Sequence, residues 1–314
     1  MSSPRFLVTG GGGFIGSHIA EALLARGEKV RVLDDFSTGR RQNLRRLDVE
    51  LIEGSITDEL ALGRAMKGVE VVFHEAALPS VPRSIERPLD SDAVNVHGTL
   101  MVLEAARAAG VRRLMFAGSS SAYGNTQVSP KHEALPTVPL SPYAVAKVAS
   151  EHYVRIYAEL HGLETLTLRY FNVFGPRQDP NGAYAAVIPR WIEGALTGRA
   201  LTIHGDGMQT RDFGYVANVV HANLLAATTS RKLSGEIVNV SCGESVSLLE
   251  LADAIAEEVG GDVERVHGPA RAGDVRDSLA DIRRAHELLG YEPQVRWREG
   301  LRRTVEALRA ELRP

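Results

Sequence analysis

The sequence has little of several features that point to particular classes of protein. One cysteine, Cys242, occurs in 314 residues, so an intramolecular disulfide or a cysteine-based zinc site has too few ligands. There is no run of about 18 apolar residues. No block of five or more like charges accompanies the formal net charge of -3. These absences argue against a membrane-spanning helix and against a broad basic surface for nucleic acid.

The N-terminal segment also lacks the basic, then apolar, then small-residue pattern of a secretory signal. A single cysteine fits a reducing compartment. We therefore expect a cytoplasmic protein that binds small molecules, with no metal site, no nucleic acid and no membrane among its partners. Any phosphate group must be bound locally.

Short apolar or β-branched runs alternate with helical patterns through the first half of the chain. Apolar residues recur three and four apart in Ile15 to Ala25, Leu89 to Ala109 and Tyr143 to Leu160. This alternation predicts an α/β fold of the Rossmann type, a doubly wound, mostly parallel sheet that binds ligands at the carboxyl ends of its strands. The expected strands are Arg5 to Thr9, Lys29 to Leu33, Val49 to Ile52, Val69 to Phe73, Arg113 to Ala117 and Thr165 to Arg169.

A glycine-rich turn follows the first expected strand and opens the first expected helix. Gly10, Gly13 and Gly16 stand at GxxGxxG spacing in the segment TGGGGFIGSHIAEALL. Glycine permits a tight turn and close approach of the backbone, and the unpaired N–H groups of a helix start attract a pyrophosphate. A plain strand-to-helix turn is the alternative, but the context favours a dinucleotide site.

Asp34 ends the second expected strand, about 20 residues after the glycine turn. A carboxylate at this place accepts hydrogen bonds from both ribose hydroxyls of NAD and repels the additional phosphate of NADP. Arg40 and Arg41 follow closely and offer that phosphate a partner. Asp35 fits either the cofactor site or a surface turn.

The regular alternation weakens after about residue 170, where glycine and proline become frequent. Isolated patterns remain: a helix at Val216 to Thr228, a strand at Glu236 to Val240 and a helix at Leu248 to Glu258. We predict a dinucleotide-binding domain at residues 1–170, joined by about residues 215–240. A smaller α/β substrate lobe then comprises residues 171–314 less 215–240.

Tyr143 and Lys147 stand four residues apart in SPYAVAKVASEHY, so a helix that begins near Pro142 presents both on one face. A neighbouring ammonium and a positive nicotinamide ring lower the pKa of a tyrosine toward neutrality, which makes it a general base. Alone, the pair also fits a helix surface. Ser119, at the end of the strand before this helix, is placed to bridge substrate and tyrosine, whereas Ser121 also fits a polar turn.

The motifs TGGGGFIG, LDDFSTG, HEAAL, SSSAYG, YAVAK and RYFNVFGP occur in this order along nearly the whole chain. In this order they resemble the extended short-chain dehydrogenase family of sugar-nucleotide enzymes. Within that family, GAYAAVIPRW, IHGDGMQTRDF and RAGDVRDSLAD are similar to motifs of the UDP-hexose 4-epimerases. Dehydratases and decarboxylases of the superfamily usually carry an acid after the catalytic hydroxyl, where this chain has Ser120 and Ser121. The resemblance therefore favours epimerisation.

The resemblance implies a mechanism with three catalytic residues. Ser119 and Tyr143 hold the 4-hydroxyl of the sugar, Tyr143 removes its proton, and Lys147 anchors the nicotinamide ribose. Hydride leaves carbon 4 for a tightly held NAD, and the 4-keto sugar turns its other face and takes the hydride back. UDP-glucuronate as the substrate, with Arg83 meeting its carboxylate, and a non-catalytic sensor of NAD and nucleotide sugar are the alternatives.

The resemblance also implies which residues contact each ligand. Asn172, Arg211, Arg271 and Asp274 match positions that hold the diphosphate and the uridine ribose. The other implied cofactor residues are Phe14, Ile15, Ser37, Thr38, Gly39, Ser55, Ile56, Ala76, Ala77 and Tyr170, with Tyr143 and Lys147 shared with catalysis. The other implied substrate residues are Ser120, Ser121, Gln178, Ala186, Val187 and Ser278.

Ser278 matches the position that limits the pocket for the substituent on sugar carbon 2. A serine leaves room for an N-acetyl group, which favours UDP-GlcNAc and UDP-GalNAc over UDP-glucose and UDP-galactose, although Ser278 also fits a turn. Pro79 stands where that subgroup often has glycine, and Ser55 stands where aspartate usually contacts adenine, so sugar selectivity and adenine recognition are expected to be looser. Small-residue faces on Leu89 to Ala109 and Tyr143 to Leu160 resemble the helices through which the family forms homodimers.

Overall fold

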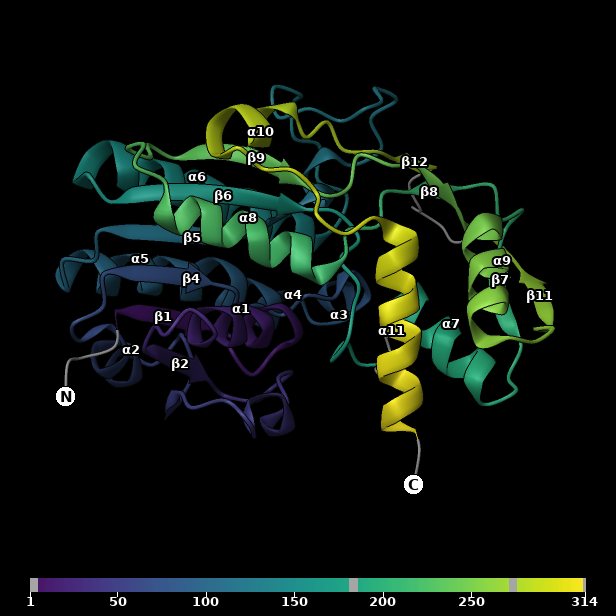
Figure 1. The fold of residues 1–314 in the computed structure, drawn as a ribbon. Helices are drawn as coiled ribbons and strands as arrows, with labels where there is room; N and C mark the ends of the chain where they lie inside the picture. The colour runs from purple at the N-terminus through teal and green to yellow at the C-terminus, as the bar shows by residue number, and fades with distance from the viewer. Residues whose placement is uncertain (1–4, 181–185, 271–275, 313–314) are drawn as a thin grey trace.

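The computed structural model describes residues 5–180, 186–270 and 276–312 and is built on a seven-stranded sheet (Figure 1). The strand order is β3-β2-β1-β4-β5-β6-β9, and every neighbouring pair is parallel. The order reverses between β1 and β4, which is where ligands bind in doubly wound sheets. The strands are β1 (Phe6–Thr9), β2 (Val30–Asp34), β3 (Glu50–Glu53), β4 (Val71–His74), β5 (Arg113–Ser119), β6 (Glu164–Tyr170) and β9 (Glu236–Val240).

Helices cover both faces of this sheet, which explains why its central strands β1 and β4 are buried along their whole length (Figure 1). Helices α1 (Phe14–Leu24) and α8 (Val216–Thr228) pack together on one face and share a buried core with β1 and β6. Helices α2 (Glu59–Met66), α5 (Thr99–Ala108) and α6 (Pro142–His161) cover the other face. The Rossmann-type α/β fold expected from the sequence is confirmed.

The expected helix at Leu89 to Ala109 is interrupted. It consists of α4 (Pro88–Asp92), a π-helical turn at Ala93–Gly98 and α5. Asn95 lies in that turn, and its side chain accepts from the Leu78 backbone N–H at 2.8 Å and donates to the Leu78 carbonyl at 3.2 Å. Its own carbonyl accepts from Ser150 of α6 at 2.7 Å. Asn95 thus links the segment around Leu78 to α6.

Helix α6 starts where the sequence predicts because Ser141 caps it, accepting from the Ala144 N–H at 3.2 Å, and Pro142 occupies its first position. It ends at Gly162, whose left-handed backbone closes the last turn. This helix has 20 residues and carries charges along its length. Within the described ranges, no helix is both long and apolar enough to cross a membrane.

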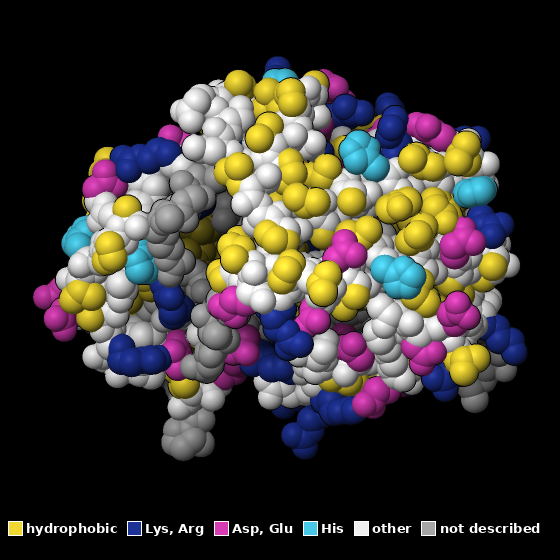
Figure 2. All heavy atoms as spheres, turned by 180° about the vertical axis from the view of Figure 1, so that it is seen from behind, with side chains coloured by type: hydrophobic (Ala, Val, Ile, Leu, Met, Phe, Trp, Pro, Cys, Tyr) yellow, Lys and Arg dark blue, Asp and Glu magenta, His cyan; other side chains and the backbone are white. Residues whose placement is uncertain are grey.

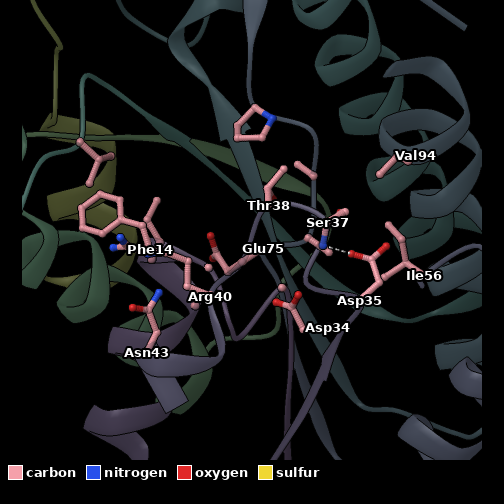
Figure 3. A pocket seen from close by; sticks show the side chains of 18 of the residues that line it. Phe14, Asp34, Asp35, Ser37, Thr38, Arg40, Asn43, Ile56, Glu75 and Val94 are labelled. Atoms are coloured by element: carbon pink, nitrogen blue, oxygen red, sulfur yellow. Dashed lines mark hydrogen bonds between the residues drawn. The ribbon is translucent and has the colours of Figure 1, made fainter. Parts of the chain in front are cut away.

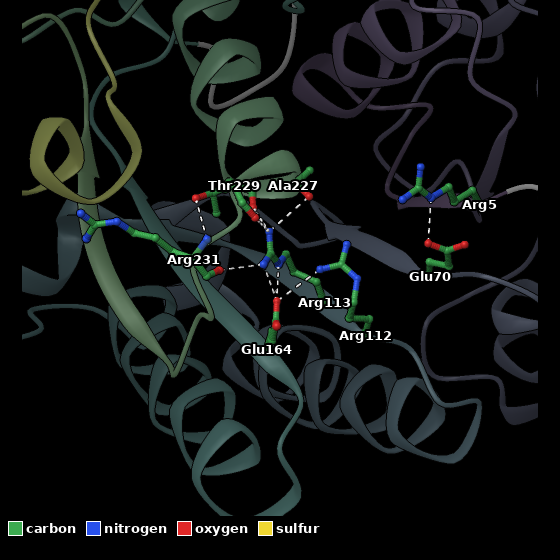
Figure 4. Close-up of polar contacts among 9 residues, drawn as sticks. Arg5, Glu70, Arg112, Arg113, Glu164, Ala227, Thr229 and Arg231 are labelled. Atoms are coloured by element: carbon green, nitrogen blue, oxygen red, sulfur yellow. Dashed lines mark hydrogen bonds and ion pairs between the residues drawn. The ribbon is translucent and has the colours of Figure 1, made fainter.

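Buried Arg113 fastens α8 to the amino-terminal edge of the sheet, opposite the predicted site (Figure 4). Its guanidinium donates to the carbonyls of Ala226, Thr229 and Arg231, each at 2.9 Å, and pairs with Glu164 of β6. The Ala226 carbonyl lies in the last turn of α8, which has no internal donors for its carbonyls, and those of Thr229 and Arg231 follow directly after the helix. The helix is thereby fixed over β5 and β6.

The later part of the chain forms a second core of its own, around Trp191, Ile203 and Leu251. Helix α10 (Arg283–Leu289) is an exception, because it packs on β9 and α8 of the large sheet although the sequence prediction placed its residues in the second lobe. The division of the chain near residue 170 remains a proposal. The other elements are α3 (Val81–Glu86), α7 (Val187–Leu196), β7 (Leu201–His204), β8 (Thr210–Arg211), β10 (Val246–Ser247), α9 (Leu248–Val259), β11 (Arg265–Gly268), β12 (Asp277–Ser278) and α11 (Trp297–Glu311).

Hydrophobic side chains gather on the face opposite that of Figure 1 (Figure 2). The most exposed ones on helices α3, α4 and α6 are Ile85 at 64%, Leu89 at 82% and Leu160 at 72%. Val145 and Tyr153 of α6 are also exposed. Such a concentration of large apolar side chains on neighbouring helices is typical of a protein interface.

Candidate active site

A cavity of about 480 Å³ lies along the carboxyl edge of the large sheet (Figure 3). Its lining comes from the ends of β1 to β6 and from the loops that follow them. Sequence motifs far apart in the chain therefore meet here. The predicted site residues in its lining are Gly10, Gly13, Phe14, Ile15, Gly16, Asp34, Asp35, Ser37, Thr38, Ser55, Ile56, Ala76, Ala77, Ser119, Tyr143, Tyr170, Asn172 and Gln178.

The glycine turn forms one wall of the cavity and has no room for side chains. Gly10 has φ +70°, and a Cβ on it would lie 2.6 Å from the Ala76 nitrogen. A Cβ on Gly16 would collide with the Gly10 carbonyl. Gly13 caps α1 without a side-chain hydrogen bond, so the first N–H groups of α1 remain available to an anion. This wall fits the pyrophosphate of a dinucleotide.

Asp34 is fixed at the end of β2 by the same turn. Its carboxylate accepts from the Gly12 N–H at 2.7 Å and the Phe36 N–H at 2.8 Å. Gly39 does not line the cavity but lies against this carboxylate, since a Cβ there would be 2.9 Å from Oδ1. A carboxylate has about four acceptor positions, so two backbone donors leave capacity for ribose hydroxyls.

Asp35 and Ser55 line the cavity and take part in local turns. The Asp35 carboxylate accepts from the Ser37 N–H at 2.9 Å, which is the turn role weighed from the sequence, while both residues also line the cavity (Figure 3). The Ser55 hydroxyl shares a 2.9 Å hydrogen bond with the Thr57 hydroxyl. Ser55 is therefore already engaged within its own turn.

Lys147 lies behind the cavity wall and is 3% exposed. Its Nζ donates to the Ala117 carbonyl at 2.8 Å and lies 5.9 Å from the centre of the Tyr143 ring. Burial lowers the pKa of Lys147 to about 8, although the Glu75 and Glu151 carboxylates act in the opposite direction. The ammonium is therefore held charged near neutral pH, within electrostatic reach of the tyrosine.

Burial raises the pKa of Tyr143 to about 12, and a hydrogen bond with Ser119 only partly opposes this. The sequence-based expectation of a lowered pKa applies to a tyrosine beside both Lys147 and a bound nicotinamide ring, and it stays a prediction. Enclosing the phenol disfavours its charged form. The Lys147 ammonium donates to the Ala117 carbonyl and also interacts electrostatically with the Glu75 and Glu151 carboxylates. The Lys147 ammonium and a positive nicotinamide ring are the two charges that would stabilise the phenolate.

Ser121 holds Ser119, for which the sequence predicts a catalytic role. Its hydroxyl donates to the Ser119 hydroxyl at 2.8 Å, and its backbone N–H donates to the same oxygen at 3.2 Å. Both interactions orient Ser119 toward Tyr143. Ser120 and Ser121 follow β5 in a short 3-10 turn and are absent from the cavity lining. Their predicted substrate contacts remain proposals.

The predicted substrate residues outside the cavity lining include Ser278, Ala186 and Val187, whereas Asn172 lines the cavity. Ser278 of β12 is opposite Arg211 of β8 in the parallel register and is 6% exposed. Ala186 and Val187 form the start of α7. Asn172 donates to the Asp212 carbonyl at 3.4 Å, next to β8. Arg271 and Asp274 lie outside the described residues.

The cavity also contains polar residues that the sequence reasoning missed. Asn43 donates to the Gly12 carbonyl at 2.9 Å and stabilises the glycine turn. Arg177 forms an ion pair with Glu21 of α1 at 2.8 Å, and its backbone carbonyl accepts from Arg40 at 2.8 Å. These two contacts link the segment before Gln178 to α1 and to the loop after β2. Glu75 is the third, and its place in the motif HEAAL beside Ala76 was the available signal.

A family model described as NAD dependent epimerase/dehydratase matches residues 6–241. The chain belongs to this family. A UDP-glucose 4-epimerase from Mycolicibacterium smegmatis is 42% identical over 97% of this chain and 98% of its own length. Two solved structures superpose at a TM-score of 0.93. One is a Thermotoga maritima UDP-glucose 4-epimerase with UDP-glucose, 40% identical over 98% of this chain and 99% of its own. The other is a Methanobrevibacter ruminantium UDP-N-acetylglucosamine 4-epimerase with UDP-N-acetylmuramic acid, 36% identical over 99% and 100%.

NAD is the cofactor of this family member, as predicted. A Thermus thermophilus UDP-glucose 4-epimerase in complex with NAD is 38% identical, with a TM-score of 0.90 over 98% of this chain and 100% of its own. The residues of this chain fit the dinucleotide, since the glycine wall excludes side chains and Asp34 ends β2 beside it. No group of three or more potential metal ligands occurs within residues 5–180, 186–270 and 276–312.

Proposed function

We propose that this enzyme interconverts UDP-GlcNAc and UDP-GalNAc by inverting carbon 4, and that it also accepts UDP-glucose and UDP-galactose. Full-length relatives and structural neighbours include 4-epimerases of UDP-glucose and UDP-N-acetylglucosamine, while decarboxylases of UDP-sugars are also among the relatives. The observation that carries the choice of sugar is Ser278, a small side chain on the strand paired with Arg211. A small residue at this place leaves space for an N-acetyl group.

The mechanism assigns one task to each catalytic residue. Tyr143 takes the proton of the sugar 4-hydroxyl, and Ser119 holds that hydroxyl while Ser121 holds Ser119. Lys147 supplies a fixed positive charge 5.9 Å from the phenol ring. The glycine wall and Asp34 would hold NAD, which would supply the hydride acceptor and donor for carbon 4.

Elimination and decarboxylation are less well supported. A decarboxylase of UDP-N-acetyl-α-D-glucosaminuronate from Bacillus cytotoxicus is 34% identical over 97% of this chain. In this chain the two residues after Ser119 are serines, and the hydroxyl of Ser121 already donates a hydrogen bond to Ser119. A general acid for loss of water is therefore absent from the place where the dehydratase and decarboxylase patterns carry one.

UDP-glucuronate is the second candidate, and one contact favours it. The Tyr143 N–H donates to Ser84 of α3 at 3.1 Å, so Arg83 lies on a helix fastened to the catalytic tyrosine. A guanidinium there is suited to a carboxylate on the sugar. A Bacillus cereus UDP-glucuronic acid 4-epimerase bound to its substrate and NAD is 31% identical, with a TM-score of 0.90.

Proton NMR of the anomeric signals tests both candidates. The purified protein is incubated, with no added cofactor, with UDP-GlcNAc, UDP-glucose or UDP-glucuronate, and Tyr143→Phe is the control. Formation of UDP-GalNAc supports the proposal, and conversion of UDP-glucuronate alone reassigns the substrate. Absence of turnover with every sugar, even when NAD is supplied, refutes the epimerase mechanism.

We also propose that two copies associate through the exposed apolar side chains of α3, α4 and α6. Ile85, Leu89 and Leu160 lie on these neighbouring helices, and a two-fold axis between copies would let each surface cover the same surface of the other. Burial of these side chains supplies the free energy of association.

A further inference from the structure

Glu75 follows β4 and reaches the cavity from its inner wall (Figure 3). The Tyr170 hydroxyl donates to Glu75 Oε1 at 2.8 Å, and Asn223 Nδ2 of α8 donates to the Tyr170 hydroxyl at 2.8 Å. The second oxygen, Oε2, has no hydrogen-bond partner among residues 5–180, 186–270 and 276–312. Two donors in series thus hold one oxygen of this carboxylate, and the other is left to the cavity.

The donor series favours an ionised Glu75. Burial raises the pKa of Tyr170 well above its ordinary value, so the hydroxyl keeps its proton and remains a donor. Burial also raises the pKa of Glu75 to about 7, while the hydrogen bond from Tyr170 and the charge of Lys147 act in the opposite direction. Glu75 therefore carries negative charge in the upper part of the neutral range.

The groups that face Glu75 come from several elements. Tyr170 of β6 and Lys147 of α6 are the titratable groups that act on it directly. Tyr143 of α6 lines the same cavity and keeps its proton near neutral pH without cofactor. Phe14 of α1 and Asn223 of α8 do not titrate. The neighbouring His74 points away, toward Thr9 and Thr99, and burial lowers its pKa to about 3.

Lys147 creates an electrostatic difficulty that Glu75 relieves. The oxidised nicotinamide ring is positively charged, whereas the reduced ring is neutral. A buried ammonium beside the ring favours the reduced form, because like charges repel strongly in a poorly screened site. A carboxylate in the same cavity has the opposite effect. If the hydride is to return to the sugar in each cycle, the reduced dinucleotide must not be much more stable in the cavity than the oxidised dinucleotide.

We propose that Glu75 is a positioning residue that sets the relative affinity of this cavity for oxidised and reduced dinucleotide. Its carboxylate offsets Lys147 and stabilises the oxidised form, and the Asn223 to Tyr170 series orients it. The inference rests on the proposed function for its purpose, since only a hydride-return cycle needs this balance. Its physical content, a preference between two forms of the cofactor, is independent of any sugar.

The test measures binding without substrate. Wild type and Glu75→Gln are equilibrated with mixtures of NAD and its reduced form of fixed ratio, and the bound ratio is read by reduced-nicotinamide fluorescence and by analysis of the released dinucleotide. Glutamine keeps the shape and the acceptor for Tyr170 but removes the charge. We expect the bound ratio to shift about tenfold toward the reduced form at about pH 7.5, between the pKa of Glu75 at about 7 and that of Lys147 at about 8, as for one unit charge acting across several ångströms.

Glu133→Gln is the matched control. Glu133 is a carboxylate away from the cavity lining that accepts from the Asn239 N–H at 2.7 Å, an interaction that glutamine retains. We expect its bound ratio to equal that of wild type. An unchanged ratio in Glu75→Gln, or an equal shift in Glu133→Gln, overturns the proposal.

Tyr170→Phe decides the question if Glu75→Gln fails to fold or to bind dinucleotide. Without the donor, Glu75 protonates at higher pH, so the ratio of this variant should shift toward the reduced form at pH 7 and approach wild type at pH 9. A shift of equal size at both pH values indicates a packing effect and refutes the assignment. These outcomes are separate from turnover, because an enzyme inactive on every UDP-sugar still reports its dinucleotide preference.

Discussion

Replacing Lys147 by methionine tests whether its charge makes Tyr143 a base. Methionine fills similar space without charge, and Nζ lies 5.9 Å from the tyrosine ring. At that separation, a unit charge in an environment with an effective dielectric constant of about 20 stabilises a phenolate by about 3 kcal/mol. This corresponds to about two pKa units, or a hundredfold change in the phenolate fraction.

The wild-type activity should follow a bell-shaped pH profile. Tyr143 must lose its proton for the acid limb to rise, and Lys147 must keep its proton, with a pKa of about 8 set by burial. In Lys147→Met the acid limb should move up by about two units, since the alkaline group is gone and the tyrosine is less acidic. At pH 7 the activity of Lys147→Met should be about a hundredfold below that of wild type. At higher pH, where the wild-type activity declines, the activity of the variant should increase about tenfold per pH unit.

The assay is the initial rate of epimer formation at saturating NAD between pH 6 and pH 10. Lys131→Met serves as the matched control, because Lys131 is also buried, at 2% exposure, but its Nζ lies near the Gly124 carbonyl rather than Tyr143. Its acid limb should coincide with that of wild type. A Lys147→Met profile parallel to wild type at every pH would refute electrostatic activation and leave Lys147 only an anchoring role.

Three further substitutions test other parts of the site and surface. Ser278→Tyr should abolish conversion of UDP-GlcNAc and retain that of UDP-glucose, and equal loss of both by NMR would contradict the pocket assignment. Gly16→Ala should lose bound NAD and lower the unfolding temperature, because its Cβ collides with the Gly10 carbonyl; an overpacking cost of about 1–3 kcal/mol is expected. Leu89→Asp should convert the proposed dimer into a monomer by light scattering, whereas Met208→Asp, another exposed apolar position, should not.

The dinucleotide half of the site was predictable because its determinants are local. Strand β2 ends at Asp34 and the turn after β1 contains Gly10, Gly13 and Gly16, so the parallel sheet alone brings them to one edge. The structure moves the expected strand ends by a residue or two. The hydrophobic pattern fixes which residues are buried, while the last hydrogen bond of each strand depends on its neighbour.

The electrostatics of the site were not predictable, because burial depends on elements distant in sequence. Tyr170 meets Glu75 across 95 residues of chain, and Glu75 looks like an ordinary acid after a strand. The same applies to Tyr143, whose motif suggests a low pKa and whose enclosure raises it. The π-turn at Asn95 was not predicted, and the Leu78 backbone that Asn95 contacts lies on another segment.

Two carboxylates, Glu75 and Glu151, raise the pKa of Lys147, but Glu151 is also paired with a buried arginine. Glu151 accepts from Arg169 at 3.0 and 2.7 Å, and these two side chains are 3% and 2% exposed. Their charges cancel, so Glu151→Gln should leave the buried Arg169 guanidinium without its anionic partner and destabilise the fold by about 3–5 kcal/mol.

Glu75 has no such cationic partner bound to it and lies at the cavity, so Glu75→Gln should leave urea unfolding nearly unchanged. Its carboxylate raises the pKa of Lys147, and its neutralisation lets the ammonium lose its proton at lower pH. The alkaline limb of the pH profile should therefore move below that of wild type. A limb that stays in place, in a variant with normal unfolding, would show that Glu151 alone sustains the charge on Lys147.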